Sequence, residues 1–329
     1  MKPIFKLKAN SNDITNFLEN RLLSLSISDE YGLISDSITI EIDDHDESFA
    51  LPDRGAEIEA FLGYSDTGLY SMGKFIADEV EISGPSNVLT VTGRAANSLF
   101  KNDMGKFMAP RTFSWEETTP ANIISTIAQR YGLKPSISKE LKTIYIDHLD
   151  QTDESDCALL QRLSKDYGSV VKIAGGVLLF FEPARGKRPD GTSLPKISVD
   201  IMELSNYRLR VSDRNKYNAV KAKYYDFDEA EEKTVTVGQG EPIFSLRETF
   251  TNRTQAQRRA KGKLEEIKRG QRILTAEMVG NPLISAESLI EITKIREELS
   301  GTWVIKRANH NLDSSGYKTS IEATRPIDN

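Results

Sequence analysis

Apolar and polar positions alternate in short runs along the first hundred residues. Ile38, Ile40 and Ile42 alternate with polar residues, and a run centred on Leu25 alternates with serines. Alternation with a period of two places one face of a strand in a core and the other in water. Similar runs separated by turn-forming residues follow at 58–62, 73–82 and 88–93. The pattern predicts a half-buried antiparallel sheet closed into a small barrel or sandwich.

The period changes to that of a helix in the middle third. Thr119 is a good N-cap, and Pro120 stands at the first helical position, where its missing N–H costs nothing. Apolar residues follow at helical spacing as far as Tyr131, and Gly132 is suited to end the helix in the left-handed conformation. Two short apolar runs around a glycine pair, 169–173 and 177–181, predict a hairpin.

A second helix is predicted over residues 152–168, directly after Gln151. Asp153, Glu154 and Asp156 would then lie in its first turn, where the helix dipole favours negative charge. These clustered acids resemble catalytic groups at first sight. Capping and the dipole account for them better, so we interpret them as a helix start.

The last third returns mainly to strands. One helix is predicted over residues 254–269, with Thr254 and Gln257 as a capping box. Strands are predicted at 197–201, 219–225, 234–237, 273–279, 289–294, 303–308 and 317–323.

These patterns predict a mainly β (α+β) chain with three domains. The first, residues 1–100, is a β-barrel domain, and the second, residues 101–195, is an α+β module with two short helices and a hairpin. The third, residues 196–329, is another β-barrel domain with one helix. A segment rich in glycine, proline and basic residues, 183–195, is predicted to be an exposed loop before the third domain.

Composition excludes several classes of function. The 329 residues carry 43 basic and 49 acidic side chains, a net charge of −6, which argues against a dedicated nucleic-acid binder. Cys157 is the only cysteine, so no internal disulfide forms, and we expect it to pack as a small apolar residue. No apolar run is long enough for a signal peptide or a membrane span, so no stable membrane insertion is expected.

The sequence contains few candidates for catalytic or ligand-binding residues. Its three histidines, His45, His148 and His310, lie far apart and outside metal-ligand spacings. His45 stands in an acidic turn, predicted to be a hydrated loop, while His148 and His310 are predicted to be structural hydrogen-bonded residues. No phosphate-binding, nucleotide-binding or nucleophile-elbow motif is present. We therefore predict no catalytic, cofactor-binding or metal-binding residues, no cofactor, and no enzyme activity.

One enzymatic alternative stays open, because a pair of carboxylates can work together from distant positions in a sequence. That alternative is a glycosidase that degrades the cell wall.

Short motifs occur in a characteristic order along nearly the whole chain. They are Asp29, Gly32 and Ser35-Asp36; Leu51-Pro52 and Gly55; Gly73-Lys74-Phe75 and Val80; Trp115 and Thr118-Thr119; His148, Gln151, Glu154, Ser155, Asp156 and Leu160; Tyr167-Gly168; and 301–305, His310 and 316–319. In this order and spacing, the chain resembles the phage late control gene D family, the central hub of contractile tail baseplates, which is similar to the hub part of type VI secretion spike proteins.

The resemblance implies two tube-like β-barrels per chain and a homotrimer that forms a pseudo-hexameric ring joining the tail tube to the central spike. It implies four protein partners, namely the tail spike, the tail tube, the tape-measure protein and the baseplate wedges. Phage DNA would pass through without sequence-specific binding. The protein would be assembled in the bacterial host cytoplasm and carried in the virion. A hub from a tailocin or a type VI secretion-like machine stays open as a further alternative.

Overall fold

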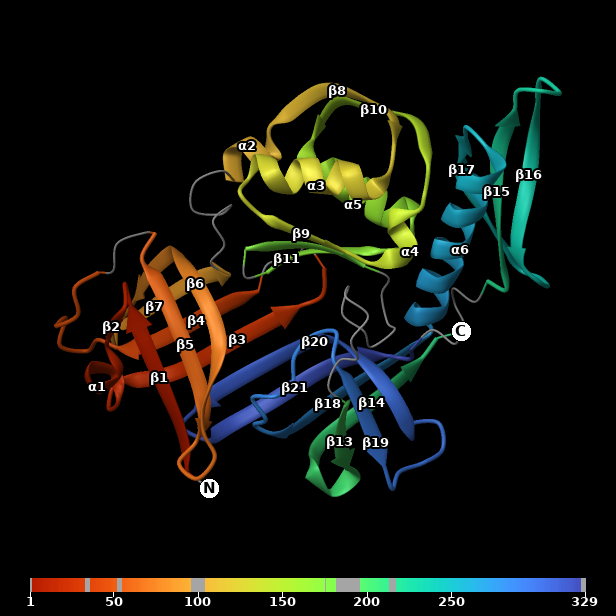
Figure 1. The fold of residues 1–329 in the computed structure, drawn as a ribbon. Coiled ribbons are helices and arrows are strands. Elements are labelled where there is room, and N and C mark those ends of the chain that lie inside the picture. The colour runs from red at the N-terminus through yellow and green to blue at the C-terminus, as the bar shows by residue number, and fades with distance from the viewer. Residues whose placement is uncertain are drawn as a thin grey trace.

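The computed structural model describes residues 2–32, 36–51, 55–95, 104–174, 176–181, 196–212 and 217–326. Strands dominate this part of the chain, and helices cluster in the middle and beside one small sheet (Figure 1). The prediction of a mainly β protein is confirmed.

The N-terminal half of the main sheet contains seven strands. They are β1 (Pro3–Ala9), β2 (Asn12–Asp13), β3 (Leu22–Glu30), β4 (Ser37–Asp43), β5 (Glu57–Tyr64), β6 (Gly68–Ser83) and β7 (Val88–Ala95), with the short helix α1 (Thr15–Leu18) after β2. Ile38, Ile40 and Ile42 are all buried, as their alternation predicts. Side chains from β1, β3, β4, β5, β6 and β7 share one core, so this half of the sheet curls around its own interior.

The C-terminal half contains six strands around a second core. They are β13 (Lys196–Asp200), β14 (Leu204–Val211), β18 (Arg272–Val279), β19 (Leu289–Thr293), β20 (Gly301–Asp313) and β21 (Gly316–Thr324), with the 3-10 turn η2 (Ile201–Glu203) before β14. Trp303 lies fully buried in this core, and its indole N–H donates to the Leu299 carbonyl over 2.7 Å.

The two halves form one continuous sheet, which the alternation pattern alone did not predict. β3 pairs antiparallel with β20, from Ser24 opposite Asp313 to Glu30 opposite Arg307. The resulting thirteen-stranded sheet has the order β14-β18-β21-β20-β3-β4-β7-β6-β5-β1-β2, with β19 and β13 branching from β20. Segments at opposite ends of the sequence therefore lie side by side in the middle of the sheet (Figure 1).

The α+β module lies over the middle of this sheet (Figure 1). Its elements are α2 (Met104–Met108), β8 (Pro110–Thr118), α3 (Pro120–Arg130), β9 (Lys134–Ile137), α4 (Lys139–Lys142), β10 (Ile146–Ser155), α5 (Asp156–Asp166), β11 (Val170–Ala174) and β12 (Val177–Phe181). The α3 cap is confirmed, because the Thr119 side chain accepts from the Asn122 N–H, and Gly132 has a φ of +65°. The predicted hairpin is also confirmed.

The predicted start of the second helix is wrong. Residues up to Ser155 belong to β10, which pairs with β8, and Ser155 is the N-cap that accepts from the Ala158 N–H. Of the three acids assigned to the first turn, only Asp156 lies there. Strand pairing with β8, which local sequence does not reveal, aligns Glu154 with Arg111 and leaves Asp153 in a bulge with a φ of +48°.

Residues 219–270 form a further unit between β14 and β18. It contains β15 (Ala219–Asp226), β16 (Glu231–Gly238), β17 (Ile243–Phe250) and α6 (Arg253–Gly270), with its own core. The predicted capping box at Thr254 is wrong, since Asn252 caps α6 by accepting from the Gln255 N–H. α5 and α6 meet at Gly168 and Gly262, where an added Cβ on either glycine would lie 2.9 Å from the other's Cα.

The predicted domain borders near residues 100 and 195, and the loop 183–195, lie outside the described residues. The three-domain division therefore stays a prediction. Within the described ranges, no helix is long and apolar enough to cross a membrane.

Candidate functional site

The outer face of the main sheet is polar across both halves, and we call it the polar face. It is defined by the side chains that alternate with the core residues on eight adjacent strands, β14, β18, β21, β20, β3, β4, β7 and β6. One row of aligned residues crosses seven of these strands: Asn206, Glu277, Ser320, Asn309, Ser28, Ser37 and Arg94. A second row runs through Lys318, Asn311, Ser26, Thr39, Thr92 and Glu79.

The register explains why this face is continuous. Side chains alternate along each strand, so the observed register of Ser26 opposite Asn311 keeps both cores buried, whereas a slip by one residue would expose one of them. Their chain neighbours Ile27 and Leu312 point into the core. Asn is depleted in strands, so its recurrence on this face is not explained by strand stability.

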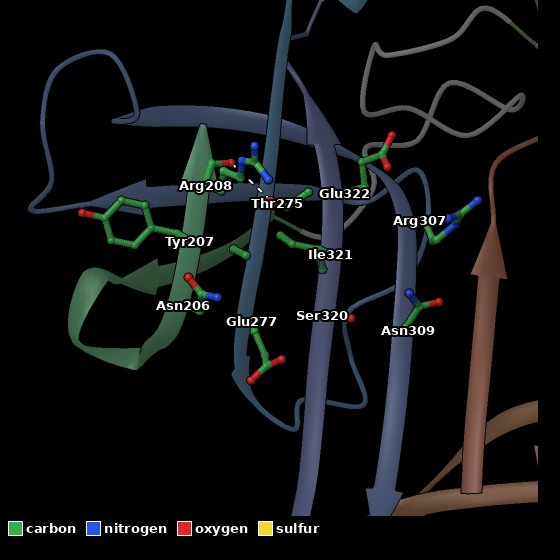
Figure 2. Close-up of a pocket in the computed structure, with 11 residues that line it drawn as sticks. Asn206, Tyr207, Arg208, Thr275, Glu277, Arg307, Asn309, Ser320, Ile321 and Glu322 are labelled. Atoms are coloured by element: carbon green, nitrogen blue, oxygen red, sulfur yellow. Dashed lines mark hydrogen bonds between the residues drawn. The ribbon is translucent and has the colours of Figure 1, made fainter. Parts of the chain in front are cut away.

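Figure 2 shows the C-terminal part of the polar face, where side chains from β14, β18, β21 and β20 line a shallow concavity of about 580 Å³. Arg208, Glu277, Arg307 and Glu322 contribute charges of both signs there, beside Asn206 and Asn309. Because charges of both signs are mixed, this concavity has no concentration of one charge that would bind a charged substrate. No nucleophile with an adjacent base lines this concavity.

The joint between the halves carries an ion pair on the same face. The Arg307 guanidinium lies 2.5 Å from the Glu30 carboxylate, which is nearly buried, whereas Arg307 is about half exposed. Arg307 and Glu30 are also directly opposite in the β20–β3 register. The pair therefore links the two halves of the sheet by charge as well as by backbone pairing.

A buried charge cluster holds the α+β module against this joint. Lys172 on β11 donates to Asp29 over 3.1 Å and to the Glu30 carbonyl over 2.8 Å, and it lies 3.7 Å from Asp36. Asp29 in turn accepts from the Ala286 N–H over 2.8 Å. The cluster thus joins β3, the α+β module and the C-terminal half at one point.

Burial is the main cause of the raised carboxyl pKa values in this cluster, and the neighbouring carboxylates add to it. Burial raises the pKa of Asp36 to about 6, although Lys172 opposes the shift. Burial likewise raises the pKa of Glu287 to about 7, and its Oε1 atom is buried without a hydrogen-bond partner. Burial would lower the Lys172 pKa, but Asp29, Glu287 and Asp36 outweigh it and raise that pKa. Our sequence interpretation missed this cluster; a lone lysine in the apolar run 170–174 was the available signal.

A second buried cluster lies inside the α+β module around Asp156. The fully buried carboxylate accepts from the Tyr131 hydroxyl over 2.7 Å and from the Gln151 amide over 2.9 Å. Arg130 and Arg111 pair with it at 3.0 and 3.3 Å. Burial and the Asp156 hydrogen bond raise the Tyr131 pKa to about 12. Gln151 and Asp156 of the acidic string are therefore structural anchors of this module.

The histidines are dispersed, as their spacing in the sequence indicates. His310 is buried; its Nε2 donates to the Ile284 carbonyl over 3.0 Å, and its Nδ1 is 2.7 Å from the Tyr317 hydroxyl. Burial lowers its pKa to about 4, so it is a neutral structural residue, as predicted. His148 is half exposed between Glu116 and Asp150, whose hydrogen bonds raise its pKa.

His45 is exposed beside Asp43, in a turn where Asp46 pairs with Arg21. In the described part of the chain, no group of three histidine, cysteine or acidic side chains is placed to hold a metal ion.

Comparison with known proteins gives a consistent family. A family model described as phage tail baseplate hub (GPD) matches residues 74–316. The probable baseplate hub protein of Escherichia phage 186 is 28% identical over 365 residues, covering 98% of this chain and 92% of that protein. The probable baseplate hub protein of Escherichia phage P2 is also 28% identical, over 364 residues, with 98% and 93% covered.

The fold has a solved counterpart. The 43 kDa tail protein of prophage MuSo2 from Shewanella oneidensis superposes with a TM-score of 0.72 at 15% identity, and the match covers 99% of both chains.

Proposed function

The chain belongs to the phage tail baseplate hub (GPD) family, whose model matches residues 74–316, and we propose that three copies form a ring joining the tail tube to the central spike. Its role as a structural component of the virion's baseplate hub follows from family membership. The trimer, the ring and the connection to tube and spike are the proposal.

The continuous polar face is the observation that carries this proposal. Two halves of one chain share a single sheet with one polar side, so each copy contributes two adjacent segments to a ring wall. Each half would close into a tube-like barrel, over residues 1–100 and 196–329, with the α+β module of residues 101–195 outside the wall. Closed symmetry would then hide strand edges that otherwise invite aggregation.

We place the polar face on the channel of this ring. Its rows of serine, threonine and asparagine keep a layer of water against the sheet and provide no apolar patch. Arg307 and Lys318 lie among carboxylates such as Glu277, Glu322 and Glu79 rather than in a basic row. DNA binds proteins largely by releasing counterions to rows of lysine and arginine, so phage DNA would pass without being held.

The partners in this proposal are the tail spike, the tail tube, the tape-measure protein and the baseplate wedges. The protein would be assembled in the host cytoplasm before it enters the virion. A tailocin or a type VI secretion-like machine would use the same ring, and the neighbouring genes would distinguish these settings from a phage.

The ring is tested by the mass of the purified 36.8 kDa chain, alone and with its coexpressed spike. Light scattering should give the mass of three chains in at least one of the two preparations. A single chain in both preparations would contradict the ring.

We further propose that the protein has no enzyme activity. A peptidoglycan zymogram should show no clearing. Clearing that disappears when one carboxylate is substituted would instead establish the alternative, a glycosidase that degrades the cell wall.

A further inference from the structure

We propose that a basic pocket at the C-terminal end of α6 binds an extended acidic segment of a partner protein. The pocket has a volume of about 910 Å³ and lies between α6, the beginning of β18 and residues 325–326 after β21. In Figure 1 it lies at the end of α6 that is nearest the main sheet. The inference does not depend on the proposed ring.

Positive charge is concentrated in this pocket, although the whole chain has a net charge of −6. A single acidic side chain, that of Glu265, lines it. The basic side chains that line it are Lys261, Lys268, Arg269, Arg272 and Arg325. The concavity on the polar face, by contrast, mixes charges of both signs. The pocket at α6 therefore favours an anionic occupant.

Four of these cations have no ion-pair partner among the described residues. Lys261, Lys268 and Arg272 are exposed. The Nη1 atom of Arg269 is buried without a hydrogen-bond partner. Because a buried N–H group without an acceptor costs free energy, an anionic oxygen that accepts from it would be stabilised.

The fifth cation, Arg325, is fixed in position. Its guanidinium donates to the carbonyls of Glu298 and Ser300 over 2.9 Å and to that of Thr302 over 3.2 Å. It also lies over the Trp303 ring, 4.1 Å from the ring centroid. The pocket thus combines one preorganised cation with free ones that can turn toward an occupant.

The spacing of the charges favours an extended segment over a single small anion. Lys261 and Lys268 are seven residues apart on α6, which places them on one face and about 10 Å apart along the helix axis. A phosphate or sulfate ion would contact only one end of this row. An extended chain with acidic residues three positions apart spans roughly 10 Å and would contact both ends. Val237 and Leu264 also line the pocket and would contact an apolar side chain of such a segment.

A single-stranded nucleic acid matches the pocket less well. Among the described residues that line it, none is aromatic, so no side chain is available for a base to stack on. Glu265 lies on α6 midway between Lys261 and Lys268 and disfavours continuous negative charge. A peptide can place a neutral residue opposite Glu265, whereas a nucleic acid carries a phosphate at every nucleotide.

The pocket lies on the side of the sheet away from the polar face. On β18, Glu277 belongs to the polar face, whereas Leu274 is buried on the other side. Arg272 is two residues before Leu274, so alternation places it on the same side as Leu274. A partner protein can therefore reach the pocket without entering the proposed channel.

Binding of short labelled peptides tests the pocket. Rhodamine-labelled hexaglutamate should bind the purified chain at low salt, measured by fluorescence anisotropy, whereas labelled hexaglutamine should not. The double variant Lys261→Glu/Lys268→Glu should weaken the binding of hexaglutamate about tenfold, because two attractions become repulsions.

The matched control is Arg247→Glu/Arg253→Glu. It makes the same charge change at two exposed positions of the 219–270 unit, and neither residue lines the pocket. The control should leave the affinity for hexaglutamate within about twofold of the wild type, because exposed charges outside the pocket are screened by salt. Absence of hexaglutamate binding to the wild type, or equal weakening by the two double variants, would overturn the proposal.

Three further outcomes would overturn it in favour of another occupant. Inorganic phosphate that displaces hexaglutamate at an equal concentration of charge would assign the pocket to a small anion. Oligothymidylate that binds more tightly than hexaglutamate, and is weakened by Lys261→Glu/Lys268→Glu, would assign it to a nucleic acid. If the wild type forms trimers by light scattering and this double variant alone does not, the occupant is a second copy of the chain.

Discussion

The main sheet has two kinds of boundary, the internal joint between β3 and β20 and the open edges at β6 and β14. Among the described strands, β14 pairs only with β18, and residues 79–83 of β6 pair only with β7. The internal joint is paired over its length, and the buried Lys172 cluster fixes the α+β module beside it. The open edges carry exposed charges and partly exposed apolar side chains. The internal joint therefore forms when the chain folds. The open edges can be covered afterwards, when copies assemble into a ring.

The largest effect is expected at the internal joint. Lys172→Met leaves the half-buried carboxylates of Asp29, Asp36 and Glu287 without their cation, and should lower the free energy of unfolding by about 3 kcal/mol. Chemical denaturation at neutral pH measures the loss. Lys318→Met, on the exposed polar face, is the control and should change stability by less than about 0.5 kcal/mol. Equal effects of the two substitutions would contradict a buried anchor at the joint.

The pH dependence of stability provides a second test of the internal joint. The Glu287 pKa is raised from 4.5 to about 7 in the folded protein, so folding favours the protonated carboxyl. The stability that this group contributes is complete below about pH 4.5 and is lost as the pH rises through 7.

Glu287→Gln keeps the neutral form at all pH values. The variant should match the wild type near pH 4.5 and exceed its free energy of unfolding by about 2 kcal/mol at pH 8. Subtracting the two stability curves removes the contributions of titrating groups that do not interact with Glu287, such as His310. A difference that does not change with pH would show that Glu287 is not buried in this cluster.

A smaller effect is expected from the exposed part of the joint. Arg307→Ala removes the partner of Glu30 and should cost about 1 kcal/mol, because Arg307 is about half exposed and water screens the pair. Lys306→Ala, whose pair with Glu322 is more exposed, provides the comparison and should cost less. Thermal unfolding of both variants and of the wild type measures which substitution costs more stability.

The smallest effect on folding is expected at the open edges. Arg208→Glu/Arg210→Glu should leave the free energy of unfolding of the isolated chain within about 0.5 kcal/mol of the wild type, because neither side chain forms an ion pair within the described chain. Chemical denaturation at a concentration that keeps the chain monomeric measures this. A large loss would mean that β14 depends on these arginines for folding, and the distinction between the two boundaries would fail.

Much of the local structure follows from the sequence, because local rules decide it. The burial of Ile38 and Ile40 follows from alternation, and the start of α3 follows from Thr119 and Pro120. The start of α5 does not, since Ser155 is as good a cap as Thr152 and only the pairing of β10 with β8 selects it.

The candidate site follows only in part. Alternation predicts that the strands have a wet face, but not that β3 and β20 pair and align their wet faces. The hydrogen bond between Asp29 and Ala286 likewise joins residues 257 positions apart in the sequence. Local sequence rules do not predict the Lys172 cluster either, because its members come from three separate parts of the chain. The resemblance to the baseplate hub family is confirmed by the family model, whereas the two tube-like barrels that it implied stay a prediction.

The most direct test is an electron cryomicroscopy map of the assembled ring with its spike. The account predicts three copies around a channel whose wall carries Asn309, Ser26 and Thr39, with the α+β modules outside. A ring in which these residues face outward, or lie against another protein instead of the channel, would contradict it.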